Sequence, residues 1–356
     1  MHNSTISLIK SRFDSKRPDL LLLNDFEDYC TQNSTWKSVN GPHLFKPLKI
    51  SSRVYTFLHH LSRPILKHIK KNSINISLGL PYEIYLFSKT FPYFTFGDRY
   101  RVLWTYDVWE PKYKSFEELV IAAKINLLLL SSRQASEYFK ALNIPGCEVH
   151  WIPESINPGD YYIRPTVDRS IDVLSFGRVY RKYHDRISKL CESNNLNYQF
   201  EKLNESTDVA LKGVKPEALQ FPSWDQFKVA LSKSKICICF PKNITHPEQA
   251  GNVSTITLRY LQAMASKCLI VGEIPLETKH LFDYDPFISV DWNDPFGQLQ
   301  QILSNYDDYA GLIERNYRSV TEKFHYDFAI NNIQMLINQN FLSENNLSVI
   351  PNSKRH

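Results

Sequence analysis

Short apolar segments alternate with amphipathic stretches along most of the chain. The apolar segments hold few polar residues, which is typical of parallel strands buried on both faces of a sheet, and the stretches between them have helical spacing. We predict strands at residues 20–24, 74–80, 101–104, 125–130, 148–152, 171–176, 197–200, 236–240, 268–272 and 287–290. The main predicted helices lie at 54–71, 132–142, 184–193, 255–266, 294–304 and 306–340.

The alternation stops once, at the segment PESINPGDYYIRPTVDR, which holds three prolines and one glycine. The predicted fold class is α/β, with two doubly wound, Rossmann-like domains joined by this segment. Such domains bind ligands at the carboxyl ends of their strands, so an interdomain cleft is the expected site. The predicted parts are an N-terminal domain (1–153), a linker (154–169), a C-terminal domain (170–320), a C-terminal helix that can pack back on the N-terminal domain (321–342) and a mobile tail (343–356).

Composition narrows the class of protein. Of the 356 residues, 43% are hydrophobic and 22% are charged, which is ordinary for a globular protein. The net charge of +5 is a mild excess without a basic, aromatic-rich stripe, so nucleic acid is not an expected partner. No apolar run approaches the ~20 residues of a membrane span, and the N-terminus lacks the apolar core of a secretory signal. The six cysteines include no CxxC pair, so we expect reduced thiols and a cytoplasmic location.

Four stretches together resemble the glycosyltransferase-B fold, in the group with bacterial mannosyl-, glucosyl- and rhamnosyltransferases. SIDVLSFGRVYRK (170–182) resembles the strand, Gly-Arg turn and nearby lysine that open the donor domain. LSKSKICICFPKN (231–243) is similar to the helix end and strand before the donor loop, and QAGNVSTITLRYLQAMASKCLIVGE (249–273) to that loop with its helix and strand. WIPESINPGDYY (151–162) resembles the interdomain linker.

This resemblance implies a hexosyltransferase-like enzyme, of a kind found in polysaccharide biosynthesis. It implies a nucleoside diphosphate sugar bound in the C-terminal domain, a glycan, lipid-linked or other hydroxyl acceptor bound in the N-terminal domain, and no separate cofactor. A nucleotide-sugar epimerase or phosphorylase on the same fold is one alternative, and a catalytically silent nucleotide-sugar-binding protein is another. The base, the sugar, the acceptor and the stereochemical outcome stay open.

The chain departs from the group at three places. Gln262 stands where a glutamate commonly holds the ribose hydroxyls, and Tyr106-Asp107 stands where the group often has His-Asp. Asn24-Asp25-Phe26 replaces a Gly-rich turn of the acceptor domain. The missing Glu and His favour the silent alternative.

A loop leads into the predicted helix 255–266. Backbone N–H groups and the helix dipole attract anions at such a start, so we expect the donor's diphosphate there. The alternative is an ordinary helix cap, since Ser and Thr are favoured at that position. The expected donor-binding loop consists of Gly251, which allows close approach, and Asn252, Val253, Ser254 and Thr255.

Basic residues follow the predicted strand 171–176. Cleavage of a nucleotide sugar leaves negative charge on the distal phosphate, and fixed cations stabilise it without a metal. We expect Gly177, Arg178 and Arg181 to contact the donor and Arg178 and Lys182 to act in catalysis, although Arg181 could take the place of Lys182. The alternative is a solvated basic turn.

Asp107 ends a predicted buried strand and is expected to face the acceptor. It would act as general base on a hydroxyl or only orient it, unless it is a turn cap. Tyr106 could hydrogen-bond the transferred sugar or pack in the core. Gln262 follows Ser254 and Thr255 by eight and seven residues, which is about two helical turns, so it is expected to reach the ribose. The alternative is that Gln262 faces solvent or a neighbouring helix.

We expect no metal site. Asp283 and Asp285 flank a tyrosine before Pro286 and are predicted to lie on a surface turn, and no histidine pair has metal-ligand spacing. The predicted helix 54–71 mixes apolar and basic residues. It could make peripheral contact with an anionic membrane, or pack on its own sheet with its charges solvated.

Overall fold

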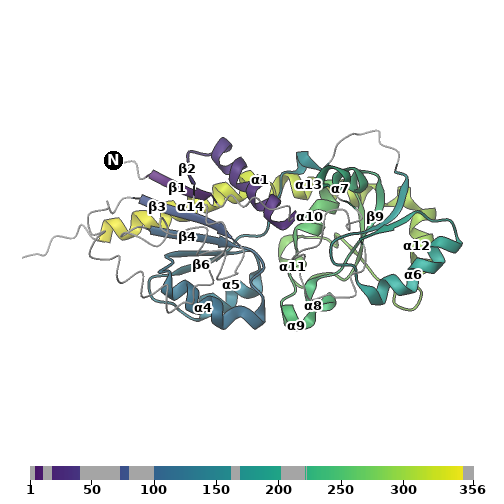
Figure 1. Ribbon diagram of the computed structural model, residues 1–356, viewed down its shortest axis with the longest axis horizontal. Coiled ribbons are helices and arrows are strands. Elements are labelled where there is room, and N and C mark those ends of the chain that lie inside the picture. Colours follow the sequence, from purple (N-terminus) through teal and green to yellow (C-terminus); the bar gives the residue numbers. More distant parts are fainter. Residues whose placement is uncertain are drawn as a thin grey trace, which may run out of the picture.

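The computed structural model describes residues 5–10, 18–40, 73–79, 100–161, 169–201, 221 and 223–347. These residues form a six-stranded and a five-stranded sheet, and every strand pair is parallel. Figure 1 shows the two sheets side by side, each with its own helices, and we call them the N-terminal and the C-terminal domain. The predicted class of two doubly wound α/β domains is confirmed.

The strands of the N-terminal sheet lie in the order β2-β1-β3-β4-β5-β6. Their bounds are β1 Thr5–Lys10, β2 Lys37–Asn40, β3 Ser73–Gly79, β4 Tyr100–Thr105, β5 Leu127–Leu130 and β6 Glu148–Trp151. The helices that accompany them are α1 Pro18–Asn33, the short 3-10 helix η1 Glu110–Lys112, α4 Tyr113–Ala122, α5 Arg133–Ala141 and α14 Tyr326–Leu347.

Helices cover both faces of the N-terminal sheet. On one face, residues of α1 and α14 pack around Trp104, whose ring centroid is 4.8 Å from that of Phe26. On the other face, α4 and α5 pack around Leu103 and Phe139. All four leucines of β5 are buried because each face of this central strand is covered, which explains their unbroken apolar run.

The strands of the C-terminal sheet lie in the order β11-β10-β9-β7-β8. Their bounds are β7 Ile171–Ser175, β8 Tyr198–Phe200, β9 Ser234–Cys239, β10 Leu269–Gly272 and β11 Ile288–Ser289. The helices around them are η2 Pro158–Asp160, α6 Arg181–Ser193, α7 Trp224–Ser232, α8 Lys242–Thr245, α9 Pro247–Ala250, α10 Leu258–Ala265, α11 Thr278–Leu281, α12 Pro295–Ser304, η4 Tyr306–Tyr309 and α13 Ala310–Lys323.

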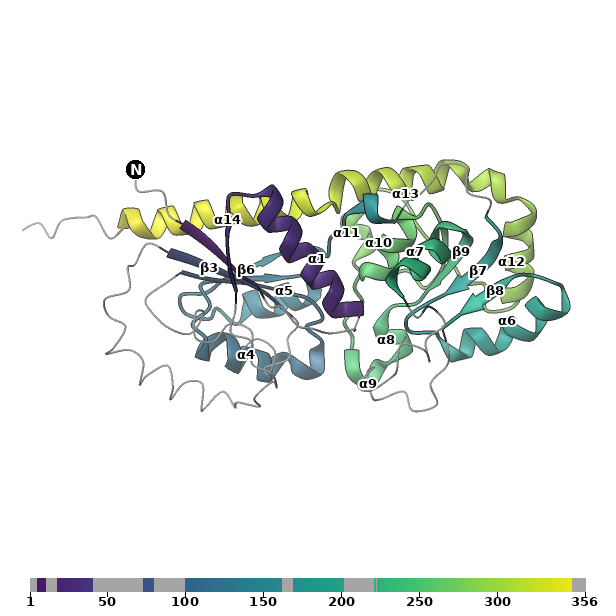
Figure 2. The same cartoon turned by 45° about the horizontal axis from the view of Figure 1, so that its top comes forward.

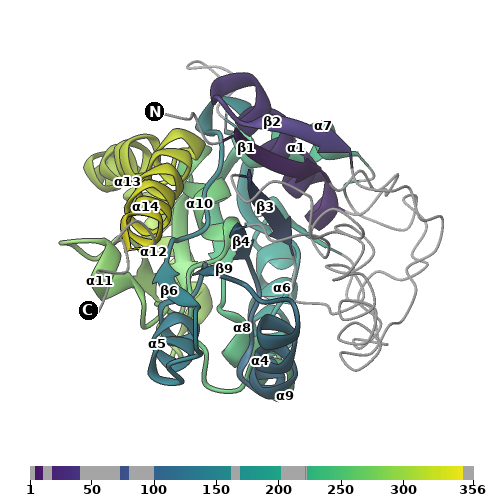
Figure 3. The ribbon, with the colours of Figure 1, turned by 90° about the vertical axis from the view of Figure 1, so that its left-hand side faces the viewer.

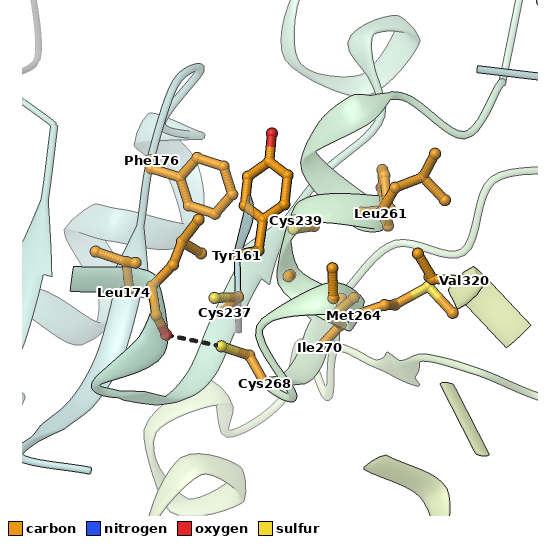
Figure 4. Packing of buried hydrophobic residues seen from close by; sticks show 14 of the residues in the cluster. Tyr161, Leu174, Phe176, Cys237, Cys239, Leu261, Met264, Cys268, Ile270 and Val320 are labelled. Atoms are coloured by element: carbon orange, nitrogen blue, oxygen red, sulfur yellow. Dashed lines mark hydrogen bonds between the residues drawn. The ribbon is translucent and has the colours of Figure 1, made fainter. Parts of the chain in front are cut away.

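The C-terminal sheet is also covered twice, by α7, α10 and α13 on one face and by α6 and α12 on the other. Figure 4 shows the first of these cores, in which Tyr161 from the segment after β6 packs beside Phe176. Three buried cysteines belong to it as free thiols, and Cys268 donates to the carbonyl oxygen of Leu231 (3.2 Å). The alternating Cys237 and Cys239 pack there as small apolar side chains.

The predicted helix 306–340 is interrupted, which is a correction. The carbonyl of Phe324 accepts from the N–H of Ile156 (2.9 Å), and the N–H of Tyr326 donates to the carbonyl of Ile156 (3.2 Å). These backbone groups bond to the segment after β6 and end α13. The chain then crosses between domains, so that α13 lies along one and α14 along the other (Figure 2). In the view of Figure 3 the two helices overlap at the same side of the molecule.

Two further boundaries differ from the prediction. Residues 20–24 belong to α1 and are not a strand. The helix that they begin continues to Asn33, and its residues Phe26 and Cys30, four positions apart and so on the same face, pack into the core. The helix α14 continues to Leu347, past Ser343 where the tail was expected to begin, since no Gly or Pro occurs before Pro351. The strands β1 and β2 were not predicted.

Some predicted features lie outside the described residues: the helix 54–71, residues 162–168 of the linker and the tail beyond residue 347. In the part of the chain that is described, no helix is long and apolar enough to cross a bilayer.

Candidate functional site

The order of strands reverses between β7 and β9, which are neighbours in the C-terminal sheet. Ligands of doubly wound sheets bind beyond the carboxyl ends of the strands at such a point. The turn Phe176-Gly177-Arg178 follows β7, and Phe240-Pro241-Lys242 follows β9. Arg178 and Lys242 therefore start from the two strand ends that flank the expected ligand position.

Arg259, on α10, holds these two strand ends together. Its guanidinium donates to the carbonyl oxygens of Phe176 (3.2 Å), Arg178 (3.0 Å) and Phe240 (3.0 Å). Gly177 has a φ of 67°, and a Cβ at this position would lie 3.0 Å from Cδ of Arg259. Glycine is needed here for its backbone conformation and for the close approach of the arginine.

Arg178 carries hydrogen-bond donors that no described residue satisfies. Its Nε and Nη2 atoms are buried and have no partner in the described part of the chain. Burial and the neighbouring Arg259 lower the pKa of Arg178 to about 9, so it remains charged at neutral pH. Because an unsatisfied buried donor costs about 1–3 kcal/mol, these N–H groups favour binding of an anion.

Further cations share this neighbourhood. The ammonium of Lys242 lies 4.7 Å from the centre of the Trp109 ring, which belongs to the N-terminal domain. Burial lowers the pKa of Lys242, Asp107 raises it and Arg178 lowers it, so these groups act on one another. Burial, Arg178 and Lys242 lower the pKa of His246, which is therefore uncharged at neutral pH.

Two acids face the cations. Asp107 follows β4 by two residues and has a φ of 58°, a conformation that costs energy in most residues and is better tolerated by Asp. Glu154, beyond β6, is buried, and its burial together with nearby Asp107 raises its pKa well above the usual range. Since this favours the uncharged form of Glu154, Asp107 is the main counter-charge to the cations.

Side chains occupy the N–H groups of the predicted donor loop. In residues 252–258 every second N–H donates to a side-chain oxygen. The four pairs are Asn252 with Glu110 (2.6 Å), Ser254 with Gln134 (2.7 Å), Ile256 with Glu277 (3.0 Å) and Leu258 with Glu154 (2.6 Å). The period of two is that of extended chain, and three of the four acceptors come from the N-terminal domain or the segment that follows it.

This pattern corrects the geometry expected for Gly251, Asn252, Val253, Ser254 and Thr255. The predicted helix 255–266 begins only at Leu258, and a carboxylate stands at the glycine: a Cβ on Gly251, whose φ is 60°, would collide with Glu110. Val253 packs in the core around Trp109. In this arrangement of the domains, the N–H groups of alternate loop residues donate to protein side-chain oxygens.

Glu277 is the most strongly bonded of these acids. Its carboxylate accepts from the hydroxyl of Thr255 (2.5 Å), the N–H of Ile256 (3.0 Å) and the N–H of Arg133 (2.6 Å). Burial nevertheless raises the pKa of Glu277 to about 7. The side chain therefore titrates close to neutral pH while joining the two domains.

We expect the free energy of unfolding to depend on Glu277 between pH 5 and pH 8. An unfolded glutamate releases its proton near pH 4.5 and the folded one near 7, so the native state binds more protons in this range and loses stability as pH rises. The loss is about 3 kcal/mol. Urea unfolding at pH 5 and pH 8 should show it in the parent and not in Glu277→Gln; equal pH dependence in both would contradict the assignment.

Gln262 is buried on α10, with 4% of its surface exposed, and its Nε2 donates to the hydroxyl of Tyr161 (3.2 Å). The register that placed it two helical turns after Ser254 is wrong, because residues 254–257 are not helical. Its contact with a ribose stays a prediction.

The other predicted residues are spread out. Arg181 and Lys182 are exposed on the first turn of α6, and the ammonium of Lys182 lies 4.9 Å from the centre of the Trp292 ring. Tyr106 is buried in the core of the N-terminal domain, where its ring centroid is 5.1 Å from that of Trp104. Of the predicted catalytic residues, the structure brings together Asp107 and Arg178 but not Lys182.

Asp283 forms an ion pair with Arg315 (3.1 Å) and is largely exposed. Among the described residues no three His, Cys, Asp or Glu side chains gather into a group that could hold a metal ion.

No family model and no curated protein matches this sequence. Solved structures do match the fold. Sucrose-phosphate synthase from Thermosynechococcus elongatus has a TM-score of 0.56 at 11% identity, over 96% of this chain and 100% of that one. Anabaena HepE in complex with UDP and glucose has a TM-score of 0.55 at 9% identity, over 94% and 100%. A glycosyltransferase from Rickettsia africae has a TM-score of 0.52 at 10% identity, over 96% and 99%.

The chain has two doubly wound domains and matches these structures over nearly its whole length, and these two observations determine its fold. It has the glycosyltransferase-B fold. Within that fold, the candidate site is where the charge of Asp107, from the N-terminal domain, acts on Arg178 and Lys242 of the C-terminal domain.

Sequence reasoning missed several residues of this candidate site. Lys242 had a signal, since it follows the predicted strand 236–240 by two residues just as Arg178 follows the strand 171–176. The others had none in the local sequence, because their partners are distant along the chain. They are Arg259, which clamps the strand ends, and the acceptors Glu110, Gln134, Glu154 and Glu277.

Proposed function

We propose that the protein is a glycosyltransferase, which moves a sugar from a nucleoside diphosphate to a hydroxyl acceptor. The observation that carries this proposal is the half-buried Arg178 at the reversal point of the C-terminal sheet, whose buried Nε and Nη2 atoms have no partner among the described residues. The fold supports it, and so does HepE, a structure of the same fold solved with UDP and glucose.

The proposed role of each residue in sugar transfer follows from the position at which negative charge develops during the reaction. Breaking the bond between the sugar and the distal phosphate leaves negative charge on that phosphate. The planar fork of Arg178 suits phosphate oxygens, and donors that are already in place and dehydrated stabilise this charge most strongly. Asp107, across the domain boundary, would orient the acceptor hydroxyl or remove its proton. The donor then occupies the C-terminal domain and the acceptor the N-terminal domain.

The acceptor we propose is a glycan or lipid-linked hydroxyl. The predicted basic helix 54–71 suits peripheral contact with an anionic membrane, where a lipid-linked acceptor would be presented. Co-sedimentation with anionic but not with neutral vesicles checks this contact.

We expect transfer activity to survive EDTA. The cations that would neutralise the leaving diphosphate are protein side chains, so the reaction needs no metal ion. The measurement is the initial rate after chelation and desalting. Loss of activity that Mn²⁺ or Mg²⁺ restores would contradict metal independence.

The proposal is tested by a thermal-shift screen with UDP, GDP, ADP, dTDP and their sugar conjugates. A ligand at 100 times its Kd should stabilise the protein by ~2.7 kcal/mol.

Release of sugar from the preferred donor, with or without an acceptor, separates an enzyme from a silent binding protein. Epimerised donor would indicate the epimerase, and binding without turnover would indicate the silent protein. If no nucleoside diphosphate or nucleotide sugar binds, the proposed function is wrong.

A further inference from the structure

Two lysines lie near the carboxyl edge of the C-terminal sheet, and they differ in their surroundings. Lys182 is exposed on α6, and its ammonium stacks on Trp292. Lys242 begins α8, directly beyond β9, and its ammonium stacks on Trp109 of the opposite domain. Arg178 acts electrostatically on Lys242 and lowers its pKa.

The geometry points to Lys242, and not Lys182, as the lysine that binds the diphosphate beside Arg178. This inference rests on the proposed function and adds a binding residue to it. β7 and β9 are neighbours at the reversal point, so the side chains that leave their ends converge on one ligand position.

The bonding of Lys242 supports this role. Its ammonium has no ion pair and no hydrogen bond with any other described residue, and it lies over the ring of Trp109. A cation over an aromatic face keeps its N–H donors on the other side free, because the ring attracts the charge without accepting all three hydrogens. The ring thus holds the ammonium in place and leaves donors for a ligand.

The charge balance supports it as well. Arg178, Arg259 and Lys242 are gathered with one main counter-charge, Asp107, which forms no ion pair with Arg178 or Lys242 within the described residues. Like charges in a dehydrated site repel strongly. An anion with more than one negative charge relieves this repulsion, and a diphosphate has the length to span two strand ends.

The contact with Trp109 also makes the site depend on both domains. The cation comes from the C-terminal domain and the ring that positions it from the N-terminal domain. The ammonium is therefore held for a diphosphate only when the domains are in the arrangement described here.

The test measures binding of UDP, inorganic pyrophosphate and uridine to the full chain and to four variants. Lys242→Met should weaken UDP and pyrophosphate about 10- to 100-fold, the value of a charge-assisted bond, and leave uridine unchanged. Lys242→Arg should stay within a few-fold of the parent. Lys267→Met is the matched control, because it too removes an ammonium stacked on a ring, that of Tyr317 at 4.6 Å, and it should change nothing. Lys182→Met is the competitor.

Each outcome decides the inference. If Lys242→Met binds UDP as the parent does, if it loses uridine equally, or if Lys182→Met alone weakens UDP, the inference is overturned while the proposed function stands. If the parent binds pyrophosphate through Lys242 but no nucleotide, the anion site stands and the proposed function fails. Should Lys242→Met not fold, Lys242→Gln takes its place, and UDP binding equal to that of the parent overturns the inference. Failure of Lys242→Met, Lys242→Gln and Lys242→Arg to fold would mean a structural role and overturn it as well.

Discussion

Replacing Arg178 by alanine is expected to lower turnover about 10²–10³-fold while weakening donor binding far less. The Nε and Nη2 atoms have no partner within the described residues, and in the proposed function they lie where negative charge grows on the departing diphosphate, so they would act mainly in the transition state. The measurement is kcat and KM for the preferred donor, together with the Kd of the nucleoside diphosphate.

Two further variants make this result specific. Arg178→Lys keeps the charge but loses the planar fork, and we expect it to recover only part of the activity. Arg186→Ala removes an exposed arginine that bonds to the carbonyl oxygen of Asn293 (3.3 Å), and it should behave as the parent does. Normal turnover in folded Arg178→Ala would remove this residue from the catalytic machinery.

Replacing Arg259 by methionine is expected to lower the free energy of unfolding by about 3 kcal/mol or more, since each buried acceptor left unsatisfied costs about 1–3 kcal/mol. Its guanidinium is the donor for three carbonyl oxygens at the ends of β7 and β9. The measurement is urea-induced unfolding at fixed pH.

Arg315→Met is the matched control for stability. Arg315 lies over the ring of Tyr284 at 3.9 Å and pairs with exposed Asp283, and such surface pairs contribute about 0–1 kcal/mol. If Arg259→Met and Arg315→Met lower the free energy of unfolding equally, the three hydrogen bonds of Arg259 do not stabilise the protein as described.

The fold could be predicted from the sequence because burial on both faces leaves a strong signal. Residues 127–130 are apolar without interruption, and the structure covers them on both sides. The same signal misled at residues 20–24, where four leucines could start either a strand or a helix. The end of α13 could not be predicted, because it depends on Ile156, a residue far away in the sequence.

The candidate site was predictable only for a residue that directly follows a predicted strand. Arg178 follows a strand and a glycine, and the structure places it at the expected edge of the sheet. The geometry of the donor loop was predicted wrongly, because its N–H groups donate to acceptors such as Glu110, which lies 142 residues away. The local sequence shows that a loop has free N–H donors, but only the tertiary structure shows which groups accept from them.

The placement of α14 has a consequence for biosynthesis. This helix supplies part of the core of the N-terminal domain, and the ring of Phe341 packs 5.7 Å from that of Tyr100 on β4. Trp36 likewise donates to Gln334 (2.8 Å). Domains usually fold in the order in which they leave the ribosome. Here the domain that emerges first lacks one layer of its core until α14 has been made, so its folding finishes only after the C-terminal domain has been synthesised.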